Sequence, residues 1–470
     1  MMRHRATLAG FLIGLLLGAT GCAGSVEIGS REGDEIVFSR DVLPLLRASF
    51  VPLLTQDSGL DARTWGTLME GSEQGEVIIP FDADRSLLIE LAERAGSDGP
   101  SAEEIALVRK WIDAGARNDA GAVPHADADR LLYVCNQGAA TISVIDMDAN
   151  LVTRTVDLRD FGFSGNARPH HVAVAPDGAA WYVSLIGENT ILKFDRSNQL
   201  VGRASFEVPG MLAMDPSSER LYVGRSMSAV NPPQRIGTLE PDGIEVEEMD
   251  VEEMDVNEMD VEEIDVFYSR PHALTVTPNG RHAYSASLGE NRLASIDAAT
   301  FDVEIVDLPG PHHGLVQFAV APDGKTMIAG GEMSGEVLFF DLEKPMSPRV
   351  VASIQVGGSP WHPTYLPDGT RVFVPRKQAD AVSIIDPASQ AETGVVSGSG
   401  IAQPHGSAVR SDGRYVYVSS NNLNAGYTPR YHHEGDPNGA VVVIDAESLQ
   451  IVKVIEVENY PTGIATRPAY

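Results

Sequence analysis

Cysteine is nearly absent from this sequence of 470 residues, which contains only Cys22 and Cys135. Two cysteines are too few for a disulfide framework or a thiolate zinc site, and they are too far apart for a Cys-x-x-Cys redox pair. Aromatic residues are also scarce, at 6%, whereas 45 glycines and 29 prolines are present. This composition favours many short strands joined by tight turns over long helices.

Positive charge is scarce as well. Lysine and arginine together number 35 against 66 aspartates and glutamates, which gives a net charge of -31. Phosphate backbones need a cationic protein face, so this balance argues against a nucleic-acid partner. Anionic lipid surfaces are disfavoured by the same repulsion.

The apolar run near the N-terminus, Leu8 to Leu17, is too short to span a membrane. It follows Arg3 and Arg5, which is the order of an export signal over residues 1–22. Residues 19–22, Ala-Thr-Gly-Cys, resemble the bacterial lipobox. The resemblance implies that Cys22 carries the lipid anchor, on the periplasmic side of the outer membrane or at the cell surface. An ordinary secretory signal with an incidental cysteine is the alternative.

A polar linker, residues 23–34, precedes a stretch, residues 35–119, whose pattern predicts helices. Ser101 and Glu104 form a capping-box pattern, and Gly115 is suited to end the helix that follows. The apolar residues of that helix fall on one face, at Ile105, Val108 and Ile112.

Four segments of this stretch, 38–42, 58–61, 86–88 and 104–116, together resemble cytochrome c-like domains of planctomycete-type exported proteins. In that family a Cys-x-x-Cys-His motif lies between the first two segments, and the spacing places Phe50, Leu53 and Leu54 there. These side chains cannot attach or ligate haem, and residues 95–100 offer no methionine ligand. We therefore expect a haem-less helical domain whose core these three side chains fill.

From residue 129 to residue 470 the chain repeats itself with a period of roughly 40 to 50 residues. One unit has an alternating strand, a Pro-Asp-Gly turn at Pro176 to Gly178, and two further strands joined by a second turn. The turn recurs at 278–280, 322–324, 367–369 and 411–413. A strand that ends in aspartate recurs at Asp146, Asp195, Asp297, Asp341, Asp386 and Asp445. Counting the opening strands gives about seven units.

The array begins and ends in mid-unit. Residues 131–134 are a second strand without a first, whereas residues 461–466 are a first strand without a second. We expect the last strand to complete the first sheet, which would close the units into a seven-bladed β-propeller. The predicted fold is therefore mainly β, with a small N-terminal helical domain.

These repeats resemble the YVTN-type propeller family. Its relatives include surface-layer proteins, phosphogluconolactonase-type enzymes and the haem-d domain of nitrite reductases. The resemblance implies a propeller and leaves the function open.

Two insertions interrupt the repeat. Residues 244–266 iterate a Val-Glu-Glu-Met-Asp-like pentamer, whose period matches neither helix nor strand, and we expect an extended, self-repelling loop there. Calcium binding is the less favoured interpretation. Residues 421–438 form a long loop that contains His432 and His433, which are candidate ligand-binding residues.

Histidines gather where the first strands begin, near the expected mouth of the central channel. His170, His272 and His405 share one position, at which other units carry Gly210, Trp361 and Thr462. His171 and His362 follow one residue later, on the opposite side of an extended strand. His312 and His313 precede an apparent insertion at 315–318 and cannot be placed in register. These seven histidines are candidate ligands for a transition metal such as copper, against the alternative of a hydrated polar channel.

Catalytic signatures are missing, since neither a Gly-x-Ser-x-Gly elbow nor a phosphate loop occurs. Arg225 and Lys377 stand where other units carry small residues, which makes them candidate ligand-binding residues together with Trp361. Cys135 is expected to be a buried small hydrophobe.

The leading interpretation is an envelope-anchored binding or scaffold propeller without a cofactor. Its partner would be a small molecule or protein at one propeller face, and it would meet the membrane through the lipid anchor only. A metal- or haem-dependent oxidoreductase is the first alternative, and a lactonase-like hydrolase is the second.

Overall fold

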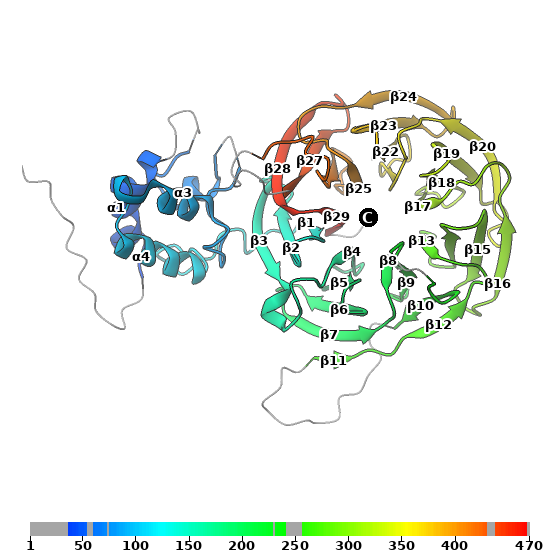
Figure 1. The fold of residues 1–470 in the computed structure, drawn as a ribbon, viewed down its shortest axis with the longest axis horizontal. Coiled ribbons are helices and arrows are strands. Elements are labelled where there is room, and N and C mark those ends of the chain that lie inside the picture. The colour runs from blue at the N-terminus through cyan, green and yellow to red at the C-terminus, as the bar shows by residue number, and fades with distance from the viewer. Residues whose placement is uncertain are drawn as a thin grey trace, which may run out of the picture. The chain divides into compact units, whose positions relative to one another are not determined.

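A computed structural model describes residues 36–53, 60–72, 75–228, 231–240, 256–429 and 438–467. Within these ranges the chain forms seven sheets that follow one another around a central axis (Figure 1). The prediction of a seven-bladed β-propeller is therefore confirmed.

Each blade has its first strand innermost and its last strand on the rim (Figure 1). Blade 1 comprises β29 (Pro461–Arg467), β1 (Leu131–Asn136), β2 (Thr141–Asp146) and β3 (Leu151–Asp157). Blade 2 comprises β4 (Pro169–Val174), β5 (Ala180–Leu185), β6 (Thr190–Asp195), β7 (Leu200–Ser205) and the added β11 (Asn257–Glu258). Blade 3 comprises β8 (Pro209–Met214), β9 (Leu221–Arg225), β10 (Arg235–Leu239) and β12 (Glu262–Asp265). Blade 4 comprises β13 (Pro271–Val276), β14 (His282–Ser287), β15 (Arg292–Asp297) and β16 (Val303–Asp307).

The remaining blades have the same order. Blade 5 comprises β17 (Leu315–Val320), β18 (Thr326–Gly331), β19 (Glu336–Asp341) and β20 (Arg349–Gln355). Blade 6 comprises β21 (Thr364–Tyr365), β22 (Val372–Arg376), β23 (Ala381–Asp386) and β24 (Ala391–Val396). Blade 7 comprises β25 (Pro404–Val409), β26 (Tyr415–Ser420), β27 (Asn438–Asp445) and β28 (Ile451–Asn459).

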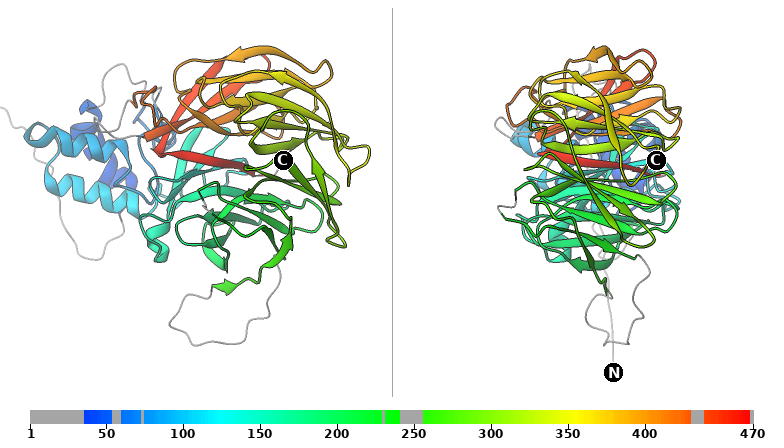
Figure 2. Two further views of the ribbon diagram at one scale, coloured as in Figure 1. Left: turned by 45° about the vertical axis from the view of Figure 1, so that its right-hand side comes forward. Right: turned by 90° about the vertical axis from the view of Figure 1, so that its right-hand side faces the viewer.

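The ring closes as the sequence predicts. Strand β29 pairs antiparallel with β1, and Ile464 lies opposite Val134. Figure 2 shows this last strand, in red, against the cyan strands of blade 1. Closure leaves no unpaired inner strand at the junction between the two ends of the array.

Each of the two recurring motifs fixes a turn between strands. Glycines of the recurring turns have φ between 69° and 73°, which is the left-handed region that glycine tolerates best. The recurring aspartates end the third strands, and Asp195 Oδ1, for example, accepts the backbone N–H of Ser197 at 2.8 Å. Such side-chain turns fix the hairpins that lead to the outer strands.

Every blade enters its first strand in the same way. The residue before that strand, or in blade 6 before Pro360, which bridges to Arg376 ahead of β21, has φ between 44° and 59°. Its carbonyl accepts the N–H of the residue after the second strand at 2.7 to 3.2 Å. Both residues therefore stand at the channel mouth in all seven blades. The positions before the first strand are Tyr460, Arg168, Val208, Arg270, Gly314, Ser359 and Gln403.

The structure corrects two expectations about insertions. Residues 315–318 are not an insertion, because Leu315 opens β17 and takes the place of the proline that opens other first strands. Residues 257–258 and 262–265 of the acidic segment are strands β11 and β12, and β12 supplies the outer strand that blade 3 needs. Ile264 is buried whereas the glutamates before it are exposed. Burial that changes from one residue to the next is typical of a strand with one face in the core. Residues 244–255 lie outside the described residues.

The N-terminal part is helical, as predicted, over η1 (Phe38–Val42), α1 (Leu43–Leu45), η2 (Leu46–Phe50), η3 (Val51–Leu53), α2 (Trp65–Met69), α3 (Leu87–Ala95), η4 (Gly96–Asp98) and α4 (Ala102–Asp113). The capping box of Ser101 and Glu104 is present at the start of α4. Phe50 is buried and Leu53 half-buried, whereas Leu54 and Cys22 lie outside the described residues. Among the described helices, none is long and apolar enough to cross a membrane.

Candidate functional site at the channel mouth

The first strands bring seven equivalent positions to the channel. Each opening residue pairs with the last residue of the second strand, as Pro169 does with Leu185 and Pro271 with Ser287. The next residue is then equivalent in all blades, which confirms the register read from the sequence. The ring consists of Thr462, His170, Gly210, His272, Val316, Trp361 and His405.

The expectation that His171 and His362 point away from this ring is wrong. The His171 and His362 rings lie 6.1 Å apart, and His362 lies 4.7 Å from His405 between ring centroids. In β4 a register shift falls between Pro169 and His171. A β-bulge of this kind breaks the strict alternation of side chains. At His362 the chain is not yet paired as a strand, since β21 begins at Thr364.

Five imidazoles therefore form one cluster of neighbouring rings, in the order His272, His170, His405, His362 and His171. The His170 ring lies 6.0 Å from His272 and 6.1 Å from His405. The indole of Trp361 closes one side, at 4.3 Å from His405. Except for half-buried His171, these side chains are almost completely enclosed.

Hydrogen bonds fix the tautomers of two imidazoles. His170 Nδ1 lies 2.8 Å from Gln137 Oε1, and His272 Nδ1 lies 2.9 Å from the carbonyl oxygen of Arg225. Both partners are carbonyl oxygens, which only accept hydrogen bonds. Both Nδ1 atoms therefore carry the proton and donate it. The Nε2 atoms of His170 and His272 then present lone pairs, and neither has a partner among the described residues.

More polar atoms of the cluster are buried without a partner among the described residues, namely His362 Nε2, His405 Nδ1 and the indole Nε1 of Trp361. Buried polar groups are satisfied by hydrogen bonds in the great majority of cases. Unmet groups concentrated at one place mark a site that a ligand or ordered water completes.

All five imidazoles are neutral at physiological pH. Burial, with smaller effects from neighbouring histidines and Lys377, holds the pKa values of His170, His362 and His405 well below the ordinary range. Burial lowers the pKa of His171 to about 3 and that of His272 to about 4. The cluster therefore offers lone pairs and N–H donors, not positive charge.

Charge is supplied from the rim of the mouth instead. The Lys377 ammonium lies 3.8 Å from the centre of the Trp361 ring. Burial lowers the Lys377 pKa to about 8, although Glu332 counteracts the shift. Burial raises the pKa of Glu332, against the attraction of Lys377 and Arg270. Arg168 is close enough to act electrostatically on His170. Lys377 and Arg270 thus act on one carboxylate, and Arg168 adds a third cation near the cluster, within an otherwise acidic protein.

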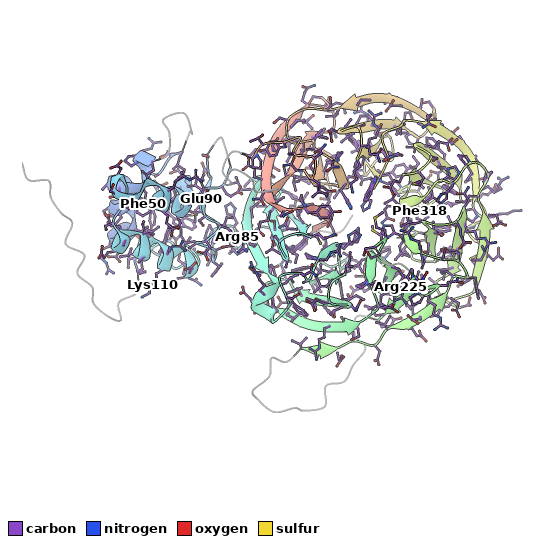
Figure 3. The ribbon with its side chains drawn as sticks, viewed as in Figure 1. Phe50, Arg85, Glu90, Lys110, Arg225 and Phe318 are labelled. Atoms are coloured by element: carbon purple, nitrogen blue, oxygen red, sulfur yellow. The ribbon has the colours of Figure 1, made fainter. Side chains whose placement is uncertain are left out.

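Arg225 is placed inside blade 3 (labelled in Figure 3). Its guanidinium donates to the carbonyls of Arg235 and Glu207 and to the carboxylate of Glu263, and it stacks on Phe206 at 3.7 Å. These contacts engage all three nitrogens of the guanidinium, so the Arg225 side chain bridges the strands of the blade. Its backbone carbonyl accepts the hydrogen bond from His272 at the site.

His312 and His313 lie outside the imidazole cluster. His312 Nε2 is 3.0 Å from the Leu288 carbonyl, and His313 contacts the Pro309 carbonyl at 2.8 Å and Glu336 at 3.3 Å. His432 and His433 lie outside the described residues. Cys135 is fully buried, as predicted, and burial raises its thiol pKa. Among the described residues, no three histidine, cysteine, aspartate or glutamate side chains are placed to hold a metal ion.

Sequence reasoning missed the second ring of the mouth. Its members follow the second strands, at Gln137, Ile186, Ser226, Leu288, Glu332, Lys377 and Asn421. Only Lys377 was singled out from this set. The signal that would have found Gln137 and Glu332 is their fixed place directly after the second strand of each repeat.

Comparison with known proteins supports the fold and does not fix a family. No family model matches the chain, and no curated protein matches it. A functionally unknown protein of Desulfotomaculum acetoxidans has a similar structure, with TM-score 0.56 and 12% identity over 72% of this chain and 98% of that one. The periplasmic gluconolactonase of Pseudomonas aeruginosa matches with TM-score 0.53 and 18% identity over 72% of this chain and 99% of that one. A putative 6-phosphogluconolactonase of Bacteroides fragilis matches with TM-score 0.52 and 13% identity, over 73% and 99%. The resemblances to the YVTN-type and cytochrome c-like families stay predictions.

Proposed function

We propose that this protein is an exported, lipid-anchored propeller that binds a small hydroxylated organic anion at the channel mouth. The observation that carries the proposal is the set of buried nitrogens at the mouth that have no partner in the described part of the chain. The lone pairs on Nε2 of His170 and His272 accept hydrogen bonds, which ligand hydroxyls would donate. The Trp361 indole N–H needs an acceptor from the ligand.

The anionic group of the ligand follows from the rim. Lys377 is charged at neutral pH, and Arg168 and Arg270 lie close enough to influence the titration of mouth residues. Hydrogen bonds between a charged donor and a carboxylate are stronger than neutral ones. A sugar acid combines the hydroxyls and the carboxylate that these groups would recognise.

Calorimetric titration with D-gluconate, D-glucose and sulfate tests the proposal. We expect gluconate to bind more tightly than either glucose or sulfate, since only gluconate has both kinds of group. The double variant His170→Ala/His272→Ala should lose at least about tenfold in affinity. His282→Gln is the control, because His282 begins β14 outside the cluster. Equal binding by the double variant, or no binding of gluconate at all, would contradict the proposal.

Hydrolysis of a lactone is a second candidate, and the Lys377 amine favours it. With a pKa of about 8 this amine exchanges a proton readily near neutral pH, as a general acid or base must. Release of acid from D-glucono-1,5-lactone, compared between the wild type and Lys377→Met, measures this activity. Equal rates in both proteins would remove the candidate.

A metal-dependent oxidoreductase ranks below both. Neutral imidazoles suit copper or zinc, and the prediction of a metal on these histidines stays open. Elemental analysis of the purified protein decides it, and one equivalent of copper retained by the wild type but not by the double variant would favour this function.

A further inference from the structure

Arg85 joins the helical part of the chain to blades 1 and 7 (Figure 3). Its guanidinium contacts Asp82 at 3.1 Å within the helical part, Asp157 at 3.0 Å at the end of β3, and Glu458 near the end of β28. Arg85 is only about one-quarter exposed, with a side-chain exposure of 24%. Three carboxylates around one partly buried cation make this contact stronger than a typical surface pair.

Side-chain hydrogen bonds continue from Glu458 toward the channel. The second carboxylate oxygen of Glu458 accepts the Thr141 hydroxyl. Asn136 Nδ2 donates to Thr141 Oγ1 at 3.1 Å and to Ser143 Oγ at 2.9 Å. Asn136 is fully buried and directly precedes Gln137. The network thus fixes the end of strand β1.

Backbone hydrogen bonds run beside this path. The two residues after Glu458 present their carbonyls to the turn between β1 and β2. The Tyr460 carbonyl accepts the Gln137 N–H at 2.9 Å, and the Asn459 carbonyl accepts the Gly138 N–H at 3.0 Å. The fit is close, since a Cβ added to Gly138 would lie 2.6 Å from Asn459 Oδ1. Moving Glu458 would therefore displace the backbone that holds Gln137.

Gln137 in turn holds His170, whose ring lies between those of His272 and His405, through the 2.8 Å contact between Oε1 and Nδ1. We infer that Arg85 is a positioning residue for the channel mouth, through which the helical part of the chain fixes the orientation and tautomer of His170. Only the expected loss of ligand affinity rests on the proposed binding function. The effect of Arg85 on the His170 tautomer does not depend on a ligand.

The test compares Arg85→Gln with Arg109→Gln. Arg109 also pairs with two carboxylates, Asp84 and Glu93, but both lie in the helical part. Nitrogen-15 NMR of histidine-labelled protein reports which ring nitrogen of His170 carries the proton, with Gln137→Leu used to assign the signal. We expect Arg85→Gln to broaden or split the His170 resonances and to weaken gluconate binding about fivefold or more. Arg109→Gln should change neither.

Glu458→Gln provides a second variant that keeps the size of the side chain and its bond to Thr141. It should reproduce the NMR change of Arg85→Gln. An unchanged His170 spectrum in both folded variants overturns the inference. If the wild type binds no gluconate but the spectra respond as expected, the proposed function fails while the positioning role stands.

Discussion

The ammonium group of Lys377 lies 3.8 Å from the centre of the Trp361 ring, at the rim of the imidazole cluster. A cation over an indole face is favourable, and this contact places the charge against Trp361, whose ring lies 4.3 Å from that of His405. The rim and the cluster therefore form one site with two different kinds of chemistry.

Binding of an organic anion should depend on pH through Lys377. Its pKa is about 8, below the ordinary value of 10.5, so the charge is present below pH 8 and is lost as the pH rises through that value. The histidines do not titrate in this range, because their pKa values lie far lower. We expect gluconate affinity to fall between pH 7 and pH 9 by about tenfold.

Lys377→Met should bind gluconate weakly at all these pH values and abolish the dependence. Lys325→Met is the matched control, because Lys325 is exposed beside Asp323 in a turn. A pH profile that is the same in the wild type and Lys377→Met would show that Lys377 does not contact the anion.

The fold could be predicted from the sequence because its signals are local and repeated. The Pro-Asp-Gly turns and the strand-ending aspartates fix hairpins within a few residues, and the missing halves at 131–134 and 461–466 reveal the closure. The shared position of His170, His272 and His405 could also be predicted, since it needs only the register of one strand.

The arrangement of the site could not be predicted to the same extent. His171 joins the cluster through a β-bulge, which alternation does not indicate. Gln137 becomes important only because the β1–β2 turn packs against residues 459 and 460, more than three hundred positions away. Arg225 breaks the pattern of its repeat position, but its partner Glu263 comes from the acidic segment, whose strand character the pentamer period obscured.

Arg225 should be important for stability and not for ligand binding. Arg225→Leu removes a buried guanidinium and leaves two carbonyls and Oε1 of Glu263 without this donor, while Glu263 Oε2 keeps its contact with Arg235. We expect a loss of about 3 kcal/mol in the free energy of unfolding. Gluconate affinity should stay within about twofold, because His272 bonds to the Arg225 backbone carbonyl, which the substitution retains.

Urea titration of Arg225→Leu and of Arg292→Leu separates this effect from the loss of an exposed ion pair, since Arg292 pairs with Asp307 at the rim of blade 4. Equal free energies of unfolding for the two variants would mean that the hydrogen bonds of the Arg225 side chain contribute little to stability.

Closure of the ring should be essential for folding. A chain that stops after Tyr460 lacks β29, so the inner edge of β1 loses its partner and Ile464 no longer covers Leu132 and Val134. An exposed inner strand is prone to pair with other chains. We expect this truncated protein to aggregate or to unfold at least about 10 °C below the full chain.

Addition of a synthetic peptide with the sequence of residues 461–467 should raise the unfolding temperature of the truncated protein, whereas a peptide of the same composition in scrambled order should not. A truncated protein as stable as the full chain would contradict the structural role of closure.

Glu76 should make stability depend on pH. Burial raises its pKa from 4.5 to about 7, with Glu456 adding to the shift while a hydrogen bond from the Val152 N–H and the charge of Lys453 oppose it. The folded state therefore binds a proton more tightly than the unfolded chain, and this contribution is fully present below pH 4.5 and is lost as the pH rises through 7. Glu76→Gln keeps the shape without the ionisable group, so it should gain about 1 to 3 kcal/mol relative to the wild type on going from pH 4.5 to pH 8. Urea titrations of both proteins at several pH values in this range measure the difference, and a constant offset between them would show that the Glu76 carboxyl is not perturbed by folding.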